Sequence, residues 1–279
     1  MTNLEERVEN IRRELYEHVL STRKNKYYWF FKALKTFKHL SGNKVRGEFL
    51  ETYYFLMRYI DDIVDGSHPR DLPIGLRSHY VEGRIKFATD SKSPHDDADY
   101  LMLHCFNLAE RLGLDFTQET LDILASLHFD ASRVGRNRIF TKGELMQHFY
   151  SLDIRGTTRL ALKIFQEDPR KQSLLENLAR ASRIYYNLRD YDEDISLGFI
   201  NIPSEDIDSF QIPIEEIKDK QSPAIREWIQ AESNTGLELL ERYKIIMSTA
   251  QFRLLTKLTL MLVYYKPARR YLEGVLRTV

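Results

Sequence analysis

The stretch RYIDDIVDG, from Arg58 to Gly66, places three aspartates in a run of otherwise apolar residues. Residues four apart lie on the same face of an α-helix, so Asp61 and Asp65 share a face, while Asp62 is offset by about 100°. Arg58 lies one turn before Asp61 on that face. Because the apolar residues recur at helical spacing, the stretch predicts a helix whose carboxylates border a buried core.

A second stretch, LRDYDEDISLG from Leu188 to Gly198, repeats this pattern. Asp190 and Asp194 are four apart, and Glu193 lies between them. Neighbouring carboxylates repel one another and weaken a helix unless their charge is neutralised. Mg²⁺ takes oxygen ligands and commonly bridges one or two carboxylates to the phosphates of a substrate. Two such turns therefore predict a magnesium-dependent diphosphate site, with Mn²⁺ as an alternative ion.

Polar side chains on the same helix faces complete the predicted site. Guanidinium groups suit phosphate oxygens because they donate two parallel hydrogen bonds. The predicted substrate-binding residues are Arg58, Arg189, Arg183 and Asn187, and the predicted catalytic residues are Asp61, Asp65, Asp190, Asp194 and Tyr54. The predicted metal ligands are Asp61, Asp62, Asp65, Asp190, Glu193 and Asp194. One acidic turn alone is also typical of a solvated or capped helix end; the second copy and the apolar flanks favour the diphosphate site.

The composition excludes several other classes of protein. Basic and acidic residues number 41 each among 279 residues, so charge gives no reason to expect a nucleic-acid partner. A single cysteine cannot form an internal disulfide, which fits a cytoplasmic protein. The apolar run LLTKLTLMLVYY is much shorter than the roughly 20 residues of a spanning helix. We expect no transmembrane segment, and peripheral membrane contact stays open.

The whole chain reads as helical. Glycine and proline are few, at 12 and 8, and apolar residues recur at three- and four-residue spacing almost throughout. The predicted helices are Asn3–Val19, Tyr27–Leu40, Gly47–Asp65, Gly75–Phe87, Asp97–Leu112, Thr117–His128, Gly143–Phe165, Lys171–Asp194, Ile214–Ile229 with a continuation to Met247, and Gln251–Leu276. No strand alternation and no long linker interrupt them, so we predict one all-α domain over residues 1–279.

Three local signals refine these helices. Thr141 and Glu144 have the spacing of a capping box, and Gly66 and Gly198 suit helix ends. The aspartates of PHDDADY, which begins at Pro94, favour a capping role over metal binding. The arginines of SRVGRNRIF, residues 132–140, favour a solvated loop over an extra diphosphate contact.

At its two acidic stretches the sequence resembles the squalene/phytoene synthase family. The family's R-x-x-D-D-x-x-D turn is matched by Arg58, Asp61, Asp62 and Asp65. Its R-D-x-x-E-D motif, followed by a glycine and an apolar stretch that ends in proline, is matched by Arg189, Asp190, Glu193, Asp194, Gly198 and Pro203. Tyr54 falls where the family has a tyrosine. The resemblance implies the helical bundle of the isoprenoid synthases, with the two acidic helices facing each other across a deep central cavity.

The resemblance also implies an activity and its substrates. The family are prenyltransferases of isoprenoid biosynthesis, which join two prenyl diphosphates, farnesyl or geranylgeranyl, head to head. The expected product is a squalene- or phytoene-type hydrocarbon, with release of diphosphate. A class I terpene cyclase acting on one prenyl diphosphate would use the same clamp, and a non-catalytic relative is a third reading. The sequence leaves NADPH dependence and the oligomeric state open.

The sequence departs from the family near the expected pocket. Where the family has serines ahead of its aromatic run, this chain has Arg23, Lys24 and Asn25. The small-residue motif A-G-x-V-G is matched only at its first glycine, in RGTTR from Arg155 to Arg159. The family's register would place these arginines at the pocket mouth, whereas the local apolar pattern favours an outward position. We expect the outward position.

Upstream of the second motif, Arg183 and Tyr186 stand where the family tends to have glutamine and asparagine. With the arginines of RGTTR, these changes put the chain length of the substrate and the shape of the pocket in doubt. The resemblance therefore predicts a divergent member of the family.

Overall fold

The computed structural model describes residues 3–40, 43–68, 72–90 and 93–278, without the side chains of residues 22–35 and 38–40. These residues are all-α, and no strand occurs among them, as the sequence predicts. The chain divides into two compact units, Met1–Ser132 and Arg133–Val279, and each is treated by itself. The single domain expected from the sequence remains a prediction. None of the described helices is long and apolar enough to span a membrane.

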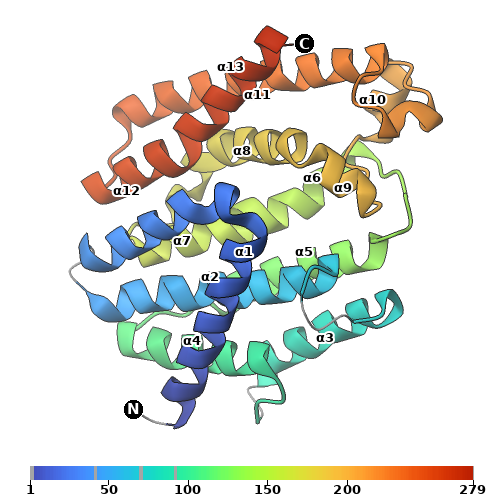
Figure 1. The fold of residues 1–279 in the computed structure, drawn as a ribbon. Helices are drawn as coiled ribbons and strands as arrows, with labels where there is room; N and C mark the ends of the chain where they lie inside the picture. The colour runs from blue at the N-terminus through green and yellow to red at the C-terminus, as the bar shows by residue number, and fades with distance from the viewer. Residues whose placement is uncertain (1–2, 41–42, 69–71, 91–92, 279) are drawn as a thin grey trace. The chain divides into compact units, whose positions relative to one another are not determined.

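The first unit is built around one acidic helix, α2. Its helices are α1 (Asn3–Leu40), α2 (Lys44–Asp65), α3 (Ile74–Asp90), α4 (Asp97–Leu112) and α5 (Thr117–Arg133). Figure 1 shows α2 beside α4, with α1 crossing both. The buried stripe of α2 comprises Phe49, Tyr53, Leu56, Ile60 and Ile63. Its three- and four-residue spacing faces one side of the helix, which leaves Asp61 and Asp65 on another side.

Helix α1 differs from the prediction, because one helix replaces the two predicted over Asn3–Val19 and Tyr27–Leu40. No proline or glycine lies between those ranges, and polarity alone does not end a helix. The side chains of Arg23, Lys24 and Asn25 lie outside the described residues.

The second unit is built around α8, which packs against α11 and α13 (Figure 1). Its elements are α6 (Lys142–Phe149), the π-helix η1 (Tyr150–Thr158), α7 (Arg159–Ile164), the 3₁₀ helix η2 (Pro169–Leu175), α8 (Glu176–Arg189), α9 (Tyr191–Ser196), α10 (Ser204–Ser209), the 3₁₀ helix η3 (Ile214–Lys218), α11 (Pro223–Thr249), α12 (Leu254–Thr259), the π-helix η4 (Leu260–Tyr265) and α13 (Lys266–Thr278). Its core includes Leu178, Leu188, Trp228, Leu240 and Leu272.

Two helices of this unit are interrupted where continuous helices were predicted. The range Ile214–Ile229 breaks after Lys218. Helix α11 begins at Pro223, because proline suits a first turn and disfavours helix in the residue before it. The range Lys171–Asp194 breaks at Asp190, where a side-chain pair described below joins adjacent residues.

The π-helical segments η1 and η4 were not predicted, since they replace parts of continuous α-helices. In η1 the Thr158 hydroxyl donates to the carbonyl of Asp153 at 2.5 Å, across the five-residue spacing of a π turn.

The predicted capping signals are confirmed. The Thr141 N–H donates to Glu144 Oε2 at 2.8 Å, and the Glu144 N–H donates to Thr141 Oγ1 at 3.2 Å. Asp96 caps α4 by accepting from the Asp99 N–H at 3.0 Å. Gly66 and Gly198 end their helices at φ values of 80° and 83°, a left-handed conformation that favours glycine.

Candidate active site

The first acidic motif occupies the last turns of α2 and is organised around Arg58. The Arg58 Nη1 atom lies 2.9 Å from Asp61 Oδ2, and Nη2 donates to Asp62 Oδ1. Asp62 is only 2% exposed, whereas the Asp61 side chain is 35% exposed. One buried guanidinium therefore pairs with two neighbouring aspartates, of which Asp61 is the more exposed.

The end of α2 is fixed around Asp62. Its Oδ1 atom also accepts from the Ser67 hydroxyl at 3.0 Å, and its carbonyl accepts from the N–H groups of Ser67 and His68 at 2.9 and 3.0 Å. Tyr54 and Asp65 are half-buried on the same helix. Asp62 thus closes the helix end while Asp61 and Asp65 flank it.

The second acidic motif crosses the junction of α8 and α9. Arg189 holds Asp190 bidentately, with Nε–Oδ1 and Nη2–Oδ2 distances of 2.9 and 2.5 Å, and its Nη1 donates to the Tyr185 hydroxyl at 3.1 Å. The guanidinium lies 5.1 and 5.0 Å from the ring centroids of Tyr185 and Tyr186. Side chains of adjacent residues diverge by about 100° on an α-helix. The Arg189–Asp190 pair accordingly coincides with the break in the helix.

Electrostatics bind this pair tightly. Burial alone would lower the pKa of Arg189, but the hydrogen bonds to Asp190 and the charge of that carboxylate raise it above its ordinary value. Burial raises the pKa of the neighbouring Tyr186 hydroxyl. Arg189 therefore stays charged and Tyr186 stays neutral at ordinary pH.

Asp194 is held by a partly buried relay of side chains. The Asn201 amide donates to Asp194 Oδ2 at 2.9 Å, and Arg133 Nη1 donates to Asn201 Oδ1 at 2.8 Å. Arg133 is buried and lies 4.8 Å from the ring centroid of Phe199. The solvated-loop prediction is therefore wrong for Arg133, because its guanidinium has an amide partner and a ring to cover it. The nearby Arg136 and Arg138 are exposed as predicted.

Close backbone packing holds this relay in place. The Gly135 N–H donates to the Leu197 carbonyl at 2.7 Å. A Cβ atom on Gly198 would lie 2.9 Å from the Gly135 backbone, so a side chain there would force the two segments apart.

Arg183 has a partner that the sequence did not predict. Its Nε and Nη2 atoms donate to the two carboxylate oxygens of Asp153 at 2.8 and 2.6 Å. The guanidinium also lies 4.7 Å from the ring centroid of Phe149. The pair links α8 to the π-helix η1, and the remaining predicted residues, Asn187 and Glu193, are half-buried.

The residues present fit a magnesium site of the kind that uses few protein ligands. Among the described residues, no three His, Cys, Asp or Glu side chains are grouped to hold a metal ion. Mg²⁺ does not need such a cage, because it keeps several waters and takes one or two carboxylates together with substrate phosphates. Asp61 and Asp65 on α2, and Asp190 beside α8, are carboxylates of this kind. Metal binding by these residues remains a prediction.

Three residues that support the motifs were missed by sequence reasoning: Asp153, Asn201 and Arg133. Asp153 and Arg183 are 30 positions apart, and no local periodicity relates them. Asn201 lies outside any predicted helix. The only usable signal was the position of Asn201, two residues before Pro203 in the apolar stretch of the second motif.

Arg155 and Arg159 lie around the boundary of η1 and α7. Arg155 is exposed, and its guanidinium lies 5.5 Å from the ring centroid of Tyr150. Arg159 is half-buried. The exposure of Arg155 agrees with the outward position that the local pattern favoured.

The fold and the two acidic motifs define a helical protein of the isoprenoid synthase type. Residues 39–277 match the squalene/phytoene synthase family model, and the chain belongs to that family. Its structure is similar to a squalene synthase, HpnC, from Alicyclobacillus acidocaldarius, with a TM-score of 0.69, 17% identity, and coverage of 97% of this chain and 95% of that one. It is also similar to a dehydrosqualene synthase solved with a ligand, with a TM-score of 0.63, 16% identity and coverage of 99% of both chains. A comparison with curated proteins gave no match.

Proposed function

We propose that this protein is a magnesium-dependent prenyltransferase that condenses two prenyl diphosphates head to head and releases diphosphate. The observation that supports it most is the presence of both acidic motifs in one family member, each with an arginine beside its acids. Neighbouring carboxylates weaken a helix unless their charge is offset, and the Asp61 side chain, which is 35% exposed, is only partly covered by its arginine.

The carboxylates we assign to metal binding are Asp61 and Asp65 in the first motif and Asp190, Glu193 and Asp194 in the second. When bound, Mg²⁺ would neutralise the charge that develops on the leaving diphosphate. Asp62 supports the first motif instead of binding metal, because its carboxylate is occupied by Arg58 and Ser67. Arg58 and Arg189 carry the positive charge nearest to the acids and are suited to phosphate oxygens.

The reaction itself needs no covalent bond to the protein. The C–O bond of the first substrate breaks with its electron pair on the diphosphate oxygen, which leaves an allylic cation. The double bond of the second substrate supplies the electron pair for the new C–C bond, and the cation that results loses a proton as a cyclopropane ring closes. The C–O bond of the second substrate then breaks in the same way and releases the second diphosphate. The rearranged cation becomes a neutral hydrocarbon by losing a proton, or by taking hydride from a reductant such as NADPH. Aromatic faces stabilise such cations and exclude water, and Tyr185 and Tyr186 bring aromatic faces to the second motif.

Incubation of the purified protein with Mg²⁺ and farnesyl or geranylgeranyl diphosphate, followed by mass spectrometry of the extract, tests this function. We expect an apolar product with twice the carbon number of the substrate. A product with the carbon number of one substrate would show a cyclase instead. No product from folded protein with either substrate would contradict the proposal.

A further inference from the structure

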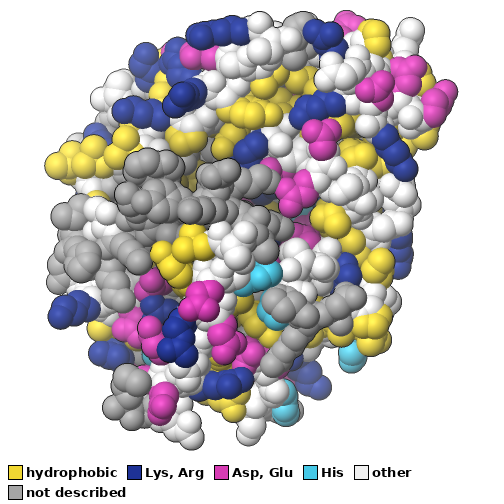
Figure 2. Space-filling model, viewed as in Figure 1, with side chains coloured by type: hydrophobic (Ala, Val, Ile, Leu, Met, Phe, Trp, Pro, Cys, Tyr) yellow, Lys and Arg dark blue, Asp and Glu magenta, His cyan; other side chains and the backbone are white. Residues whose placement is uncertain are grey.

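An exposed apolar and basic stripe runs along the last third of the second unit. Leu254, Leu258 and Leu262 follow one another at four-residue spacing and are 73%, 48% and 55% exposed. Lys266 and Arg270 continue at the same spacing and are also exposed. We call these five residues the leucine–lysine stripe. Figure 2 shows hydrophobic side chains reaching the surface at the left edge, where Figure 1 places α12.

The helical geometry keeps the stripe straight. Four residues overshoot one α turn by about 40°, because an α turn takes 3.6 residues. They fall short of one π turn, because its hydrogen bonds span five residues. In the succession of α12, η4 and α13, the rotation of the stripe around the helix axis in the α segments is therefore largely reversed in the π segment. The opposite side of these elements is buried through Thr256, Leu260, Tyr265 and Ala268.

The start of the stripe is anchored to the unit by Glu167. Its carboxylate accepts from the Arg253 N–H at 2.7 Å, the Thr256 hydroxyl at 2.8 Å and Lys171 Nζ at 2.7 Å. The exposed leucines are thus fixed on a docked helix rather than on a loose end of the chain.

The charged residues within the segment that carries the stripe all have one sign. From Ala250 to Leu272 the sequence contains no Asp or Glu, whereas the chain as a whole has equal numbers of acidic and basic residues. The cations in this segment are Arg253, Lys257, Lys266, Arg269 and Arg270. Arg269 is neutralised by Glu241 and Glu273 at 2.6 and 2.8 Å. Within the part of the chain that the structure describes, Lys257, Lys266 and Arg270 form no ion pair.

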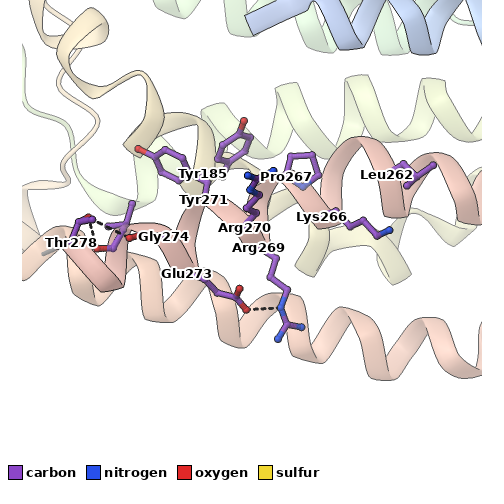
Figure 3. Close-up of a pocket in the computed structure, with 11 residues that line it drawn as sticks. Tyr185, Leu262, Lys266, Pro267, Arg269, Arg270, Tyr271, Glu273, Gly274 and Thr278 are labelled. Carbon is purple, nitrogen blue, oxygen red and sulfur yellow. Dashed lines mark hydrogen bonds and ion pairs between the residues drawn. The ribbon is translucent and has the colours of Figure 1, made fainter. Parts of the chain in front are cut away.

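A groove adjoins the stripe. It has a volume of about 940 Å³, and its lining includes Leu262, Lys266, Arg270, Tyr185 and Tyr271. None of the predicted site residues lines it. Figure 3 shows Arg269 turned to Glu273, while Leu262 and Lys266 follow each other along the helix. Arg269 also borders the groove but is paired with acids, and the other two basic residues there, Lys266 and Arg270, belong to the stripe.

We propose that the leucine–lysine stripe is a docking surface for an anionic lipid bilayer. A helix with exposed leucines on one side and lysine and arginine beside them lies in the plane of a bilayer, with its apolar face in the acyl boundary. Negative lipid headgroups complement the unpaired cations of this acid-free segment. This proposal is additional to the proposed function, because binding of the protein to lipid vesicles can be measured without any catalysis.

Sedimentation of the full-length protein with vesicles tests the proposal. The vesicles are phosphatidylcholine alone, or equal parts of phosphatidylcholine and phosphatidylglycerol, and binding is measured at low and high salt. We expect binding to the mixed vesicles that weakens with salt. The Lys257→Gln, Lys266→Gln, Arg270→Gln variant should lose about fivefold in partition for each charge removed. The Leu258→Ser, Leu262→Ser variant should lose at least about tenfold.

Matched controls carry the same changes on exposed residues of the first unit. These are Ile74→Ser with Leu76→Ser, and Arg13→Gln with Lys86→Gln and Arg111→Gln. They should bind vesicles as the unchanged protein does. Absence of binding to anionic vesicles, or equal losses in stripe and control variants, would overturn the proposal. So would an unchanged protein that is a dimer in light scattering and becomes a monomer when the leucines are replaced, because the stripe would then contact a second copy of this chain.

Discussion

The first acidic motif lies within one unbroken helix, whereas the second crosses the junction of two helices. In the first, a single arginine bridges two aspartates, and the buried Asp62 ties the helix end to Ser67. In the second, Arg189 pairs with one acid, its neighbour Asp190, and Asp194 accepts from Asn201, which accepts from Arg133. The acids of the first motif are thus positioned by residues of their own helix and its end. In the second motif, Asp194 is positioned by a series of hydrogen-bonded side chains from other segments.

This difference changes how the acidic pattern is read. Repulsion among neighbouring carboxylates was an argument for a metal ion, but arginines within the motifs already offset it. We therefore expect replacement of an exposed acid to lower turnover. Replacement of a buried acid should instead lower the free energy of unfolding.

The largest expected effect concerns the acids we assign to the metal. Asp61→Asn and Asp190→Asn should each lower turnover about 100-fold or more, because each removes a carboxylate where charge must be balanced in the transition state. The measurement is diphosphate release from farnesyl diphosphate with Mg²⁺. The control is Asp192→Asn, since Asp192 lies within the second motif but is exposed and only 3.5 Å from Lys220. If Asp192→Asn lowers turnover by a comparable factor, the losses reflect the removal of any negative charge and not the removal of a metal ligand.

Asp62→Asn should instead lower stability, by about 3 kcal/mol, because it breaks the buried ion pair between Arg58 and Asp62. Thermal unfolding monitored by circular dichroism in metal-free buffer measures this. Asp61→Asn is the matched comparison, and we expect it to change stability by less than about 1 kcal/mol, since its side chain is partly exposed. Equal destabilisation by both changes would mean that the ion pairs of Arg58 with Asp61 and with Asp62 contribute equally to stability.

Asn201→Ala tests the relay of the second motif. The change leaves buried Arg133 without its amide acceptor and Asp194 without its donor, so we expect a loss of about 2 kcal/mol in stability. Turnover should fall as well, with KM for the diphosphate rising. Unchanged kinetics in a destabilised variant would show that Asp194 does not depend on Asn201 for its position.

The smallest effect is expected on η1, where Arg155 faces solvent and Asp153 holds Arg183. Arg155→Ala should leave KM unchanged for farnesyl and geranylgeranyl diphosphate and should alter stability by less than about 0.5 kcal/mol. Asp153→Asn is the inward counterpart and should be clearly destabilising, because Arg183 loses both of its hydrogen bonds to a carboxylate. A large rise in KM for Arg155→Ala would place that arginine at the diphosphate.

Sequence reasoning was most accurate where local rules act. The apolar stripe of α2, the capping box at Thr141 and the left-handed glycines at 66 and 198 all follow from periodicity or backbone sterics within a few residues. It failed where distant residues decide. The Asp153–Arg183 pair joins residues 30 positions apart, and no local spacing encodes it.

The central claim is that the two motifs serve one and the same reaction. Turnover of the Asp61→Asn, Asp190→Asn double variant, compared with each single variant by diphosphate release, tests this most directly. When two residues act as a unit, replacing both lowers turnover by much less than the product of the two single losses. We therefore expect the double variant to have about the turnover of the less active single variant. A double variant whose loss equals the product of the two single losses would contradict a joint role of the two motifs in that reaction.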